Sequence, residues 1–301
     1  MVCFFILFIL EAPMNQKTKG ILCILSSAFC FSLMNTFVRL SGELPSTQKS
    51  FFRNLVALVF AVIVLLKSGG GFHFQRPNLK FLLLRSALGT IGVLGNFYAV
   101  DHLLLSDATM LSKLGPFFAV IASFFLLKER IRPFQLCAVL AAFAGSLLII
   151  KPSGAGFADL VPALIGLVGA LGAGTAYTTV RYLSKHGERG PFIVFFFSAF
   201  SCAVLLPFLL FDYHPMSLEQ LGFLLLAGLA AAGGQFSVTA AYSFAPARDI
   251  SVFDYTQVLF AALTGFFLFG QVPDLLSFIG YGIICGISVL MFFYNKKHAG
   301  S

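Results

Sequence analysis

The chain has 301 residues, of which 58% are hydrophobic and only 11% are charged, and its mean hydropathy is +0.93. An ordinary soluble domain has roughly 45–50% apolar and about 25% charged residues, so this composition excludes a soluble enzyme and a disordered chain. The six cysteines are too sparse for a disulfide-rich secreted module, and the composition predicts a membrane protein instead.

The N-terminal tail, residues 1–19, opens with an apolar run that is too short to cross a bilayer. Residues 1–13 are interpreted either as an upstream extension from start-codon choice or as a frayed tail, because Met14 begins a more ordinary N-terminus. Ten longer apolar segments follow, and a spanning helix needs about 20 such residues. The segments cover residues 20–40, 49–67, 79–101, 107–127, 133–151, 160–183, 191–211, 218–243, 250–270 and 273–294. The short breaks between them predict an all-α integral membrane protein with antiparallel neighbours.

The basic residues predict the orientation of these ten transmembrane helices. With a cytoplasmic N-terminus, fourteen of the 20 Lys and Arg residues fall in the inside loops and tails, and four, Arg53 among them, fall at the outside ends. The other two, Arg85 and Lys113, fall inside segments. By the positive-inside rule, both termini are expected to be cytoplasmic, including the C-terminal tail 295–301. The predicted location is the cell inner (cytoplasmic) membrane, as a multi-pass protein.

A constant offset of 142 residues relates the two halves of the chain. It pairs Val38-Arg39 with Val180-Arg181, Phe81–Leu84 with Phe223–Leu226, Asp107 with Asp249, and Phe124–Leu126 with Phe266–Leu268. The offset defines a first repeat at 20–151, a linker at 152–159 and a second repeat at 160–294. Each repeat holds five helices, an odd number, so the second is expected to be inverted. Inverted repeats place a substrate site near the midplane and allow one set of helices to rock against the other.

The fourth segment and its exit, from Leu114 to Ile131, combine a proline-centred helix with an acidic residue at the following loop. This pattern, in ten helices forming two inverted repeats, resembles the EamA-type members of the drug/metabolite transporter superfamily. The second repeat departs from it, with Val258 aligned to Pro116 and Gln271 aligned to Glu129. The resemblance implies carriage of a small polar metabolite or drug across a cytoplasmic membrane, often by export. It also implies a central cavity lined by the first, third, fourth, sixth, eighth and ninth helices, with the second and seventh lying outward.

Lys113 and Asp254 are candidate substrate-binding residues because each lies inside an apolar segment. A charge at mid-bilayer costs roughly 2.5–3.5 kcal/mol, so it is expected to face a cavity or a partner. In unbroken helices Lys113 would lie about 9 Å from one face and Asp254 about 6 Å from the other, so direct contact requires the helices to tilt or break. Three interpretations stay open: binding of substrate or a coupled proton, a structural ion pair, and snorkelling to opposite faces.

Uncharged polar side chains concentrate in the segments that the resemblance assigns to the cavity. The candidates for substrate contact are Asn35, Asn96, Tyr98, Tyr177, Gln235, Tyr242, Tyr255 and Gln257. Each of them also fits the alternative role of bridging helices or bonding its own backbone.

Two further patterns concern movement and assembly. Pro116 after Gly115 predicts a kink in the fourth segment and a gating hinge. Gly282 and Gly286 form a GxxxG pattern in the tenth segment, which is interpreted as a homodimer face or as internal packing.

The predicted function is a secondary transporter of a small polar or amphipathic metabolite, amino-acid-like, S-adenosylmethionine-like or an organic cation, working by alternating access. The sequence has no G-x-x-x-x-G-K-[ST] phosphate loop, and no cofactor, metal or nucleic acid is expected. A sugar nucleotide is disfavoured, because a polyanion needs several cavity cations and only Lys113 lies well inside a segment. The alternatives are a membrane channel, which needs a polar stripe or charged ring, and an intramembrane enzyme, which needs a second acid or a Ser-His pair.

Overall fold

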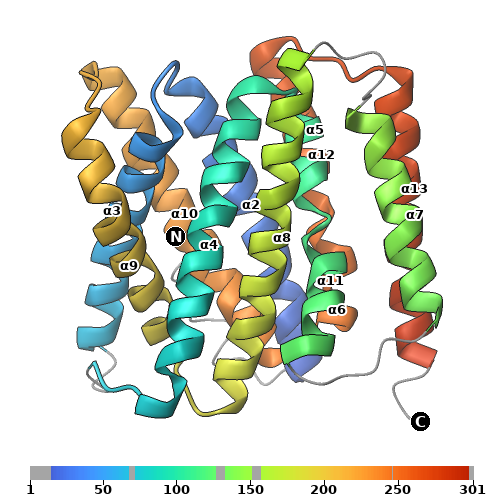
Figure 1. The fold of residues 1–301 in the computed structure, drawn as a ribbon, viewed down its shortest axis with the longest axis horizontal. Helices are drawn as coiled ribbons and strands as arrows, with labels where there is room; N and C mark the ends of the chain where they lie inside the picture. Colours follow the sequence, from blue (N-terminus) through green and yellow to red (C-terminus); the bar gives the residue numbers. More distant parts are fainter. Residues whose placement is uncertain (1–14, 68–71, 127–132, 151–156, 246, 298–301) are drawn as a thin grey trace.

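The computed structural model describes residues 15–67, 72–126, 133–150, 157–245 and 247–297, and these ranges form a bundle of helices (Figure 1). The suggested extension 1–13 and residues 152–156 of the predicted linker lie outside the described residues, whereas residues 157–159 already belong to a helix. The elements are α2 (Gln16–Leu40), α3 (Ser46–Lys67), η1 (Arg76–Asn78), α4 (Leu79–His102), α5 (Leu105–Ser112), α6 (Gly115–Leu126), α7 (Pro133–Ile150), α8 (Phe157–Lys185), α9 (Gly190–Phe211), α10 (Leu218–Phe244), α11 (Ala247–Asp254), α12 (Thr256–Phe269) and α13 (Leu275–Lys297).

The ten predicted apolar segments are all found as helical segments. In the described part of the chain, nine of them are long and apolar enough to cross a membrane, and α7 contributes a shorter apolar stretch at Leu136–Ile149. The prediction of an all-α integral membrane protein is therefore confirmed.

Local sequence signals define several helix ends. The Asn15 side chain caps α2 by accepting a hydrogen bond from the Thr18 amide at 2.7 Å. Ser217 and Gln220 form a reciprocal capping box at the start of α10. Gly270 ends α12 with φ of +61°, a left-handed conformation that glycine adopts without steric cost.

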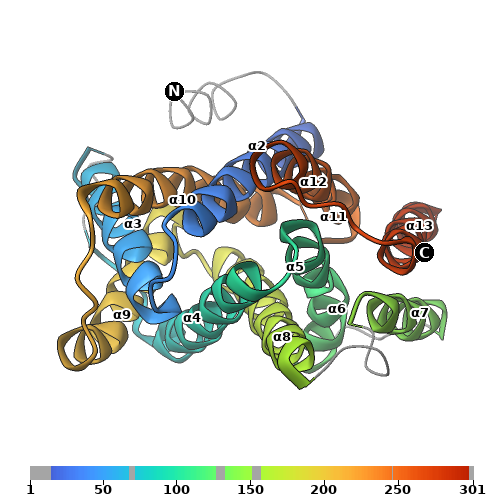
Figure 2. The same cartoon turned by 90° about the horizontal axis from the view of Figure 1, so that it is seen from above.

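The helices pack in pairs that respect the internal repeat. Helix α2 packs against α10, and their counterparts at the 142-residue offset, α8 and α4, pack against each other. Figure 2 shows α3 beside α9 at one end of the bundle and α7 beside α13 at the other. Both of these pairs join equivalent helices from the two repeats, as two inverted five-helix repeats require.

The fourth and ninth segments, expected as single helices, are each broken in two. Helix α5 ends at Ser112 and α6 begins at Gly115, whereas α11 ends at Asp254 and α12 begins at Thr256. Pro116 has no N–H to continue the backbone hydrogen bonds of the fourth segment, but Val258 occupies the equivalent position of the ninth segment. The break therefore recurs in both repeats even though only one of them contains the proline.

Small residues allow close contact between α8 and the first-repeat helices α4 and α6. A Cβ atom on Gly95 would lie 2.7 Å from the Ile165 carbonyl oxygen, and one on Gly174 would lie 2.1 Å from the Gly115 carbonyl oxygen. A Cβ on Gly282 or Gly286 would meet nothing within 4 Å in the described part of the chain. Internal packing, one of the two interpretations of the GxxxG pattern, therefore does not explain these two glycines.

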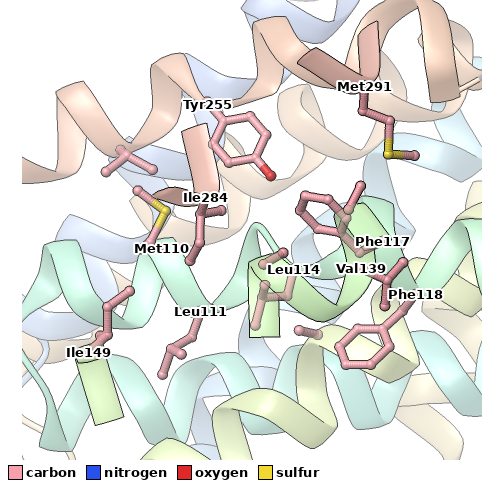
Figure 3. Close-up of a cluster of buried hydrophobic side chains, with 14 of the residues drawn as sticks. Met110, Leu111, Leu114, Phe117, Phe118, Val139, Ile149, Tyr255, Ile284 and Met291 are labelled. Carbon is pink, nitrogen blue, oxygen red and sulfur yellow. The ribbon is translucent and has the colours of Figure 1, made fainter. Parts of the chain in front are cut away.

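An apolar cluster attaches the outer pair α7 and α13 to the broken helices. Figure 3 shows Met110 and Phe117 of the broken fourth segment close to Val139 of α7 and Ile284 of α13. Tyr255, the residue between α11 and α12, belongs to the same cluster and is 8% exposed. The break in the ninth segment is thus packed on one side by this cluster, and its other side faces the interior of the bundle.

Candidate functional site

A central cavity of about 110 Å³ lies where the helices of the two repeats meet. One water needs roughly 10–15 Å³ of such space, so the cavity has room for several waters or a small ligand. Ten of the residues predicted for the site line it: Asn35, Asn96, Lys113, Gly115, Pro116, Tyr177, Gln235, Tyr242, Asp254 and Gln257. The structure therefore brings together in one cavity residues that are more than 200 positions apart in the sequence.

Two of the predicted residues lie elsewhere. Tyr98 lines a separate outward groove with Leu94 and Leu164, and its ring stacks on His102 with centroids 4.2 Å apart. Tyr255 is turned toward the apolar cluster, and its hydroxyl donates to the backbone carbonyl of Lys113 at 2.9 Å. Both side chains belong to segments that reach the cavity, but they project from other sides of those segments.

Lys113 and Asp254 form a buried ion pair at the two helix breaks. The Lys113 Nζ atom lies 2.7 Å from Asp254 Oδ2 and donates a second hydrogen bond, of 2.6 Å, to Gln257 Oε1. The side chains are 5% and 17% exposed, so neither snorkels to a membrane face. The direct contact leaves ion pairing and substrate or proton binding as the interpretations that the geometry permits.

The contact forms because both helices begin earlier than hydropathy suggests. Helix α5 starts at Leu105 and α11 at Ala247, so the helical rise carries Lys113 about 12 Å and Asp254 about 10 Å inward from opposite ends. In a hydrocarbon layer of about 30 Å, the remaining gap is within reach of a lysine side chain. The breaks at Ser112 and Asp254 then free both side chains to approach each other.

Uncharged groups complete the lining. Asn96 Nδ2 donates to Asn35 Oδ1 at 2.9 Å and links α4 to α2. The rings of Tyr177 and Tyr242 stack with centroids 5.0 Å apart and planes inclined by 11°. This pair offers a flat aromatic surface inside the cavity, and Asn35 Nδ2 has no hydrogen-bond partner among the described residues.

The cavity also contains two arginines that sequence reasoning missed, Arg53 of α3 and Arg85 of α4. They are 1% and 2% exposed, and their guanidinium carbons lie 5.6 Å and 4.0 Å from the centre of the Phe197 ring. On the sequence alone, Arg53 falls at an outside end and Arg85 inside the third segment, but neither is among the predicted site residues, and Lys113 is the one cation expected well inside a segment. Arg85 gave a usable signal because it lies inside the third apolar segment, 79–101, whereas Arg53 lies near the start of the second segment and gave none.

The second and seventh helices therefore do not lie wholly outward, as the resemblance implied. Helix α3 contributes Arg53 to the cavity, and α9 contributes Phe197, which is 1% exposed. The two helices pack against each other, and each contributes a side chain to the cavity wall. Helix α9 is bulky and apolar, and it covers the bundle on its outer face. On its inner face it supplies the Phe197 ring to the cavity.

Comparison with known proteins agrees with this architecture. The model of the EamA-like transporter family matches residues 18–151 and 160–293. The pseudopaline exporter CntI of Pseudomonas aeruginosa is 32% identical over 281 residues, which cover 93% of this chain and 97% of that protein. A riboflavin transporter of Vibrio cholerae is 26% identical over 281 residues, covering 90% and 91%. A solved crystal structure with 16% identity superposes with a TM-score of 0.68 over 93% of this chain and 98% of that chain.

Two inverted repeats around a polar cavity define the class as membrane transporters. The chain belongs to the EamA-like transporter family, within the drug/metabolite transporter superfamily. It is thus a multi-pass membrane transporter and not an enzyme, and it acts on a small-molecule substrate.

Proposed function

We propose that this protein is a secondary transporter that carries a small polar or amphipathic metabolite across the cytoplasmic membrane by alternating access. The observation that carries the proposal is the Lys113–Asp254 ion pair, which joins the two helix breaks inside the central cavity. The relatives named above carry different cargo names, pseudopaline and riboflavin, so similarity alone does not transfer a substrate. The substrate class must therefore be inferred from the residues that line the cavity.

The proposed movement uses the breaks as pivots. Broken helices let backbone and side chains at membrane depth contact a ligand, and rocking of one repeat against the other exposes the site to each side in turn. Substrate, or a proton taken up by Asp254, would replace one partner of the ion pair and release the other. Proton coupling is part of this proposal, and it predicts that an imposed pH gradient changes the initial rate of uptake.

Uptake and counterflow in proteoliposomes test the proposal. The panel consists of labelled amino acids, S-adenosylmethionine and aromatic organic cations. A secondary transporter gives saturable uptake that is stimulated by unlabelled compound on the opposite side. A channel gives uptake that is neither saturable nor stimulated in this way.

Variants connect the activity to the site. Lys113→Ala and Asp254→Asn are expected to abolish counterflow, and Lys80→Gln, at an exposed position of α4, is the matched control that retains it. Full transport by both cavity variants, at equal amounts of folded protein, would contradict a role for the ion pair in transport.

A further inference from the structure

The charges that line the cavity do not balance. Among the described residues that line it, Arg53, Arg85 and Lys113 are cationic and Asp254 is the one anion, which gives a formal net charge of +2. Lys113 is already engaged by Asp254 and Gln257. The excess positive charge therefore resides on the two arginines.

Neither arginine has an ionic partner among the described residues. Arg53 donates to neutral groups, the Asn54 and Gln235 side-chain oxygens, and the Nε atoms of Arg53 and Arg85 have no hydrogen-bond partner in the described part of the chain. Both guanidinium groups lie against the same Phe197 ring, so their positive charges are close to each other. Contact with the Phe197 ring offsets part of the desolvation cost but does not supply a hydrogen-bond acceptor.

Arg85 is directed toward the middle of the membrane instead of toward the near face. A basic side chain close to a helix end usually snorkels toward the interface. Here a Cβ atom on Gly89, one turn further along α4, would lie 2.3 Å from Arg85 Nη1 and 2.9 Å from the Phe197 ring. The glycine thus leaves the space in which the guanidinium group lies, against Phe197 and inside the cavity.

We infer that Arg53 and Arg85 form a carboxylate subsite, so that the transported substrate is an organic acid or an amino acid and not a simple organic cation. The inference rests on the proposed function and narrows its substrate class. The planar guanidinium fork suits a carboxylate, and both unpartnered Nε atoms are donors that an anionic ligand satisfies.

In the same cavity, the Asp254 carboxylate suits the amino group of a zwitterion. Asp254 uses Oδ2 for Lys113, and among the described contacts its other oxygen is not engaged. Tyr177 lines the same cavity as Asp254 and both arginines. Its ring, stacked on Tyr242, offers an aromatic surface to a ligand in that cavity.

The test compares compounds that differ only in the carboxylate. Each of the twenty amino acids is paired with its carboxamide, and S-adenosylmethionine is paired with its decarboxylated form. Counterflow by the wild-type protein is expected for acids and not for their neutral partners. Equal transport of acid and amide would overturn the inference and leave the proposed function standing, whereas absence of saturable transport for every compound would count against the proposed function.

Binding is measured separately, by thermal unfolding of the purified full-length protein with the same pairs. At least one acid is expected to raise the unfolding temperature while its amide does not. Stabilisation by neither member of any pair, or by both equally, overturns the inference whatever the transport assay gives.

Arginine variants test whether Arg53 and Arg85 are the residues that bind the carboxylate. Arg85→Gln and Arg53→Gln are each expected to raise the concentration of acid that gives half-maximal counterflow by about 10-fold to 100-fold. Loss of a hydrogen bond from a charged group has an effect of this size. Without ligand, Arg85→Gln is expected to be at least as stable as wild type, because it removes an unpaired buried charge. A less stable Arg85→Gln with unchanged half-saturation would mark a structural arginine and overturn the subsite. Lys80→Gln, on the same helix but exposed, is the control.

Discussion

Tyr255 donates its hydroxyl to the backbone carbonyl of Lys113 over 2.9 Å, and these two residues occupy equivalent positions in the two repeats, 142 residues apart. Each of them lies at the break of its own segment, directly after Ser112 in one case and before Thr256 in the other. Residues related by a two-fold operation touch each other only near its axis. The pseudo-two-fold axis of the repeats therefore passes close to this bond, next to the ion pair and the cavity.

Removing this hydroxyl is expected to destabilise the protein. Tyr255→Phe leaves the Lys113 carbonyl without its donor, and a hydrogen bond between membrane helices is worth on average about 0.6 kcal/mol and at most about 2 kcal/mol. Thermal unfolding in detergent should show a decrease of a few degrees. Tyr213→Phe, at a side chain that is 52% exposed, should unfold at the wild-type temperature. An unchanged unfolding temperature for Tyr255→Phe would show that the bond contributes nothing to stability.

The ion pair allows structural and functional roles to be separated. Removing one partner leaves a buried charge unpaired, and Lys113→Met or Asp254→Leu alone is expected to lower the free energy of unfolding by about 3–5 kcal/mol. The double variant removes both charges and should recover most of that stability. Counterflow, however, should stay lost in all three variants. Recovered transport in the double variant would show that the pair serves structure alone.

Pro116 is the predicted hinge residue, and Gly115 before it begins α6. Pro116→Ala restores an N–H that can bond the Ser112 carbonyl, so it should stiffen the break in the fourth segment. We expect the maximal rate of counterflow to fall more than the half-saturation concentration changes. Pro207→Ala, inside α9 at an exposed position, provides the control. A wild-type rate for Pro116→Ala would remove the hinge assignment, since the equivalent break at Tyr255 forms without proline.

Much of the architecture was predictable because it depends on composition over long windows. Twenty-residue apolar segments and a constant 142-residue offset survive local irregularities, so hydropathy and self-comparison found the helical segments and their inversion. The breaks were harder to predict. A hydropathy window that averages over Leu105–Leu126 does not detect that the helix is interrupted for two residues, between Ser112 and Gly115. Pro116 gave a signal in the first repeat, but Val258 gave none in the second.

The site residues also divide into those that a sequence signal predicted and those that only the structure shows. Lys113 and Asp254 were found because a charge inside an apolar run is costly wherever it points. Arg53 was missed, because a basic residue near a segment end is ordinarily at the interface, and only the structure shows α3 beginning as early as Ser46. Tyr98, predicted for the cavity, lies in a separate groove, because membership of a helix does not fix the side of the helix on which a residue lies.

The contact between α6 and α8 is expected to tolerate no added atom. Gly174→Ala would place a Cβ 2.1 Å from the Gly115 carbonyl oxygen, and separating the helices should cost about 1–3 kcal/mol. Gly282→Ala, which meets nothing within 4 Å in the described part of the chain, should keep the stability or gain up to about 1 kcal/mol from helix propensity. Thermal unfolding of both variants checks this contrast, and equal effects would contradict it. The homodimer face at Gly282 stays a prediction, to be checked by the same variant's oligomeric state.

The charge distribution predicts which end of the bundle faces the cytoplasm, and cysteine labelling can check that prediction. His73 lies between α3 and α4 at the end expected inside, and Tyr213 lies between α9 and α10 at the end expected outside. In a variant with all native cysteines replaced by serine, Tyr213→Cys should react with a membrane-impermeant maleimide in intact cells. His73→Cys should react only after the cells are permeabilised. Because both positions are exposed in the structure, a difference in reactivity reports sidedness and not burial, and the reverse pattern would invert the assigned topology.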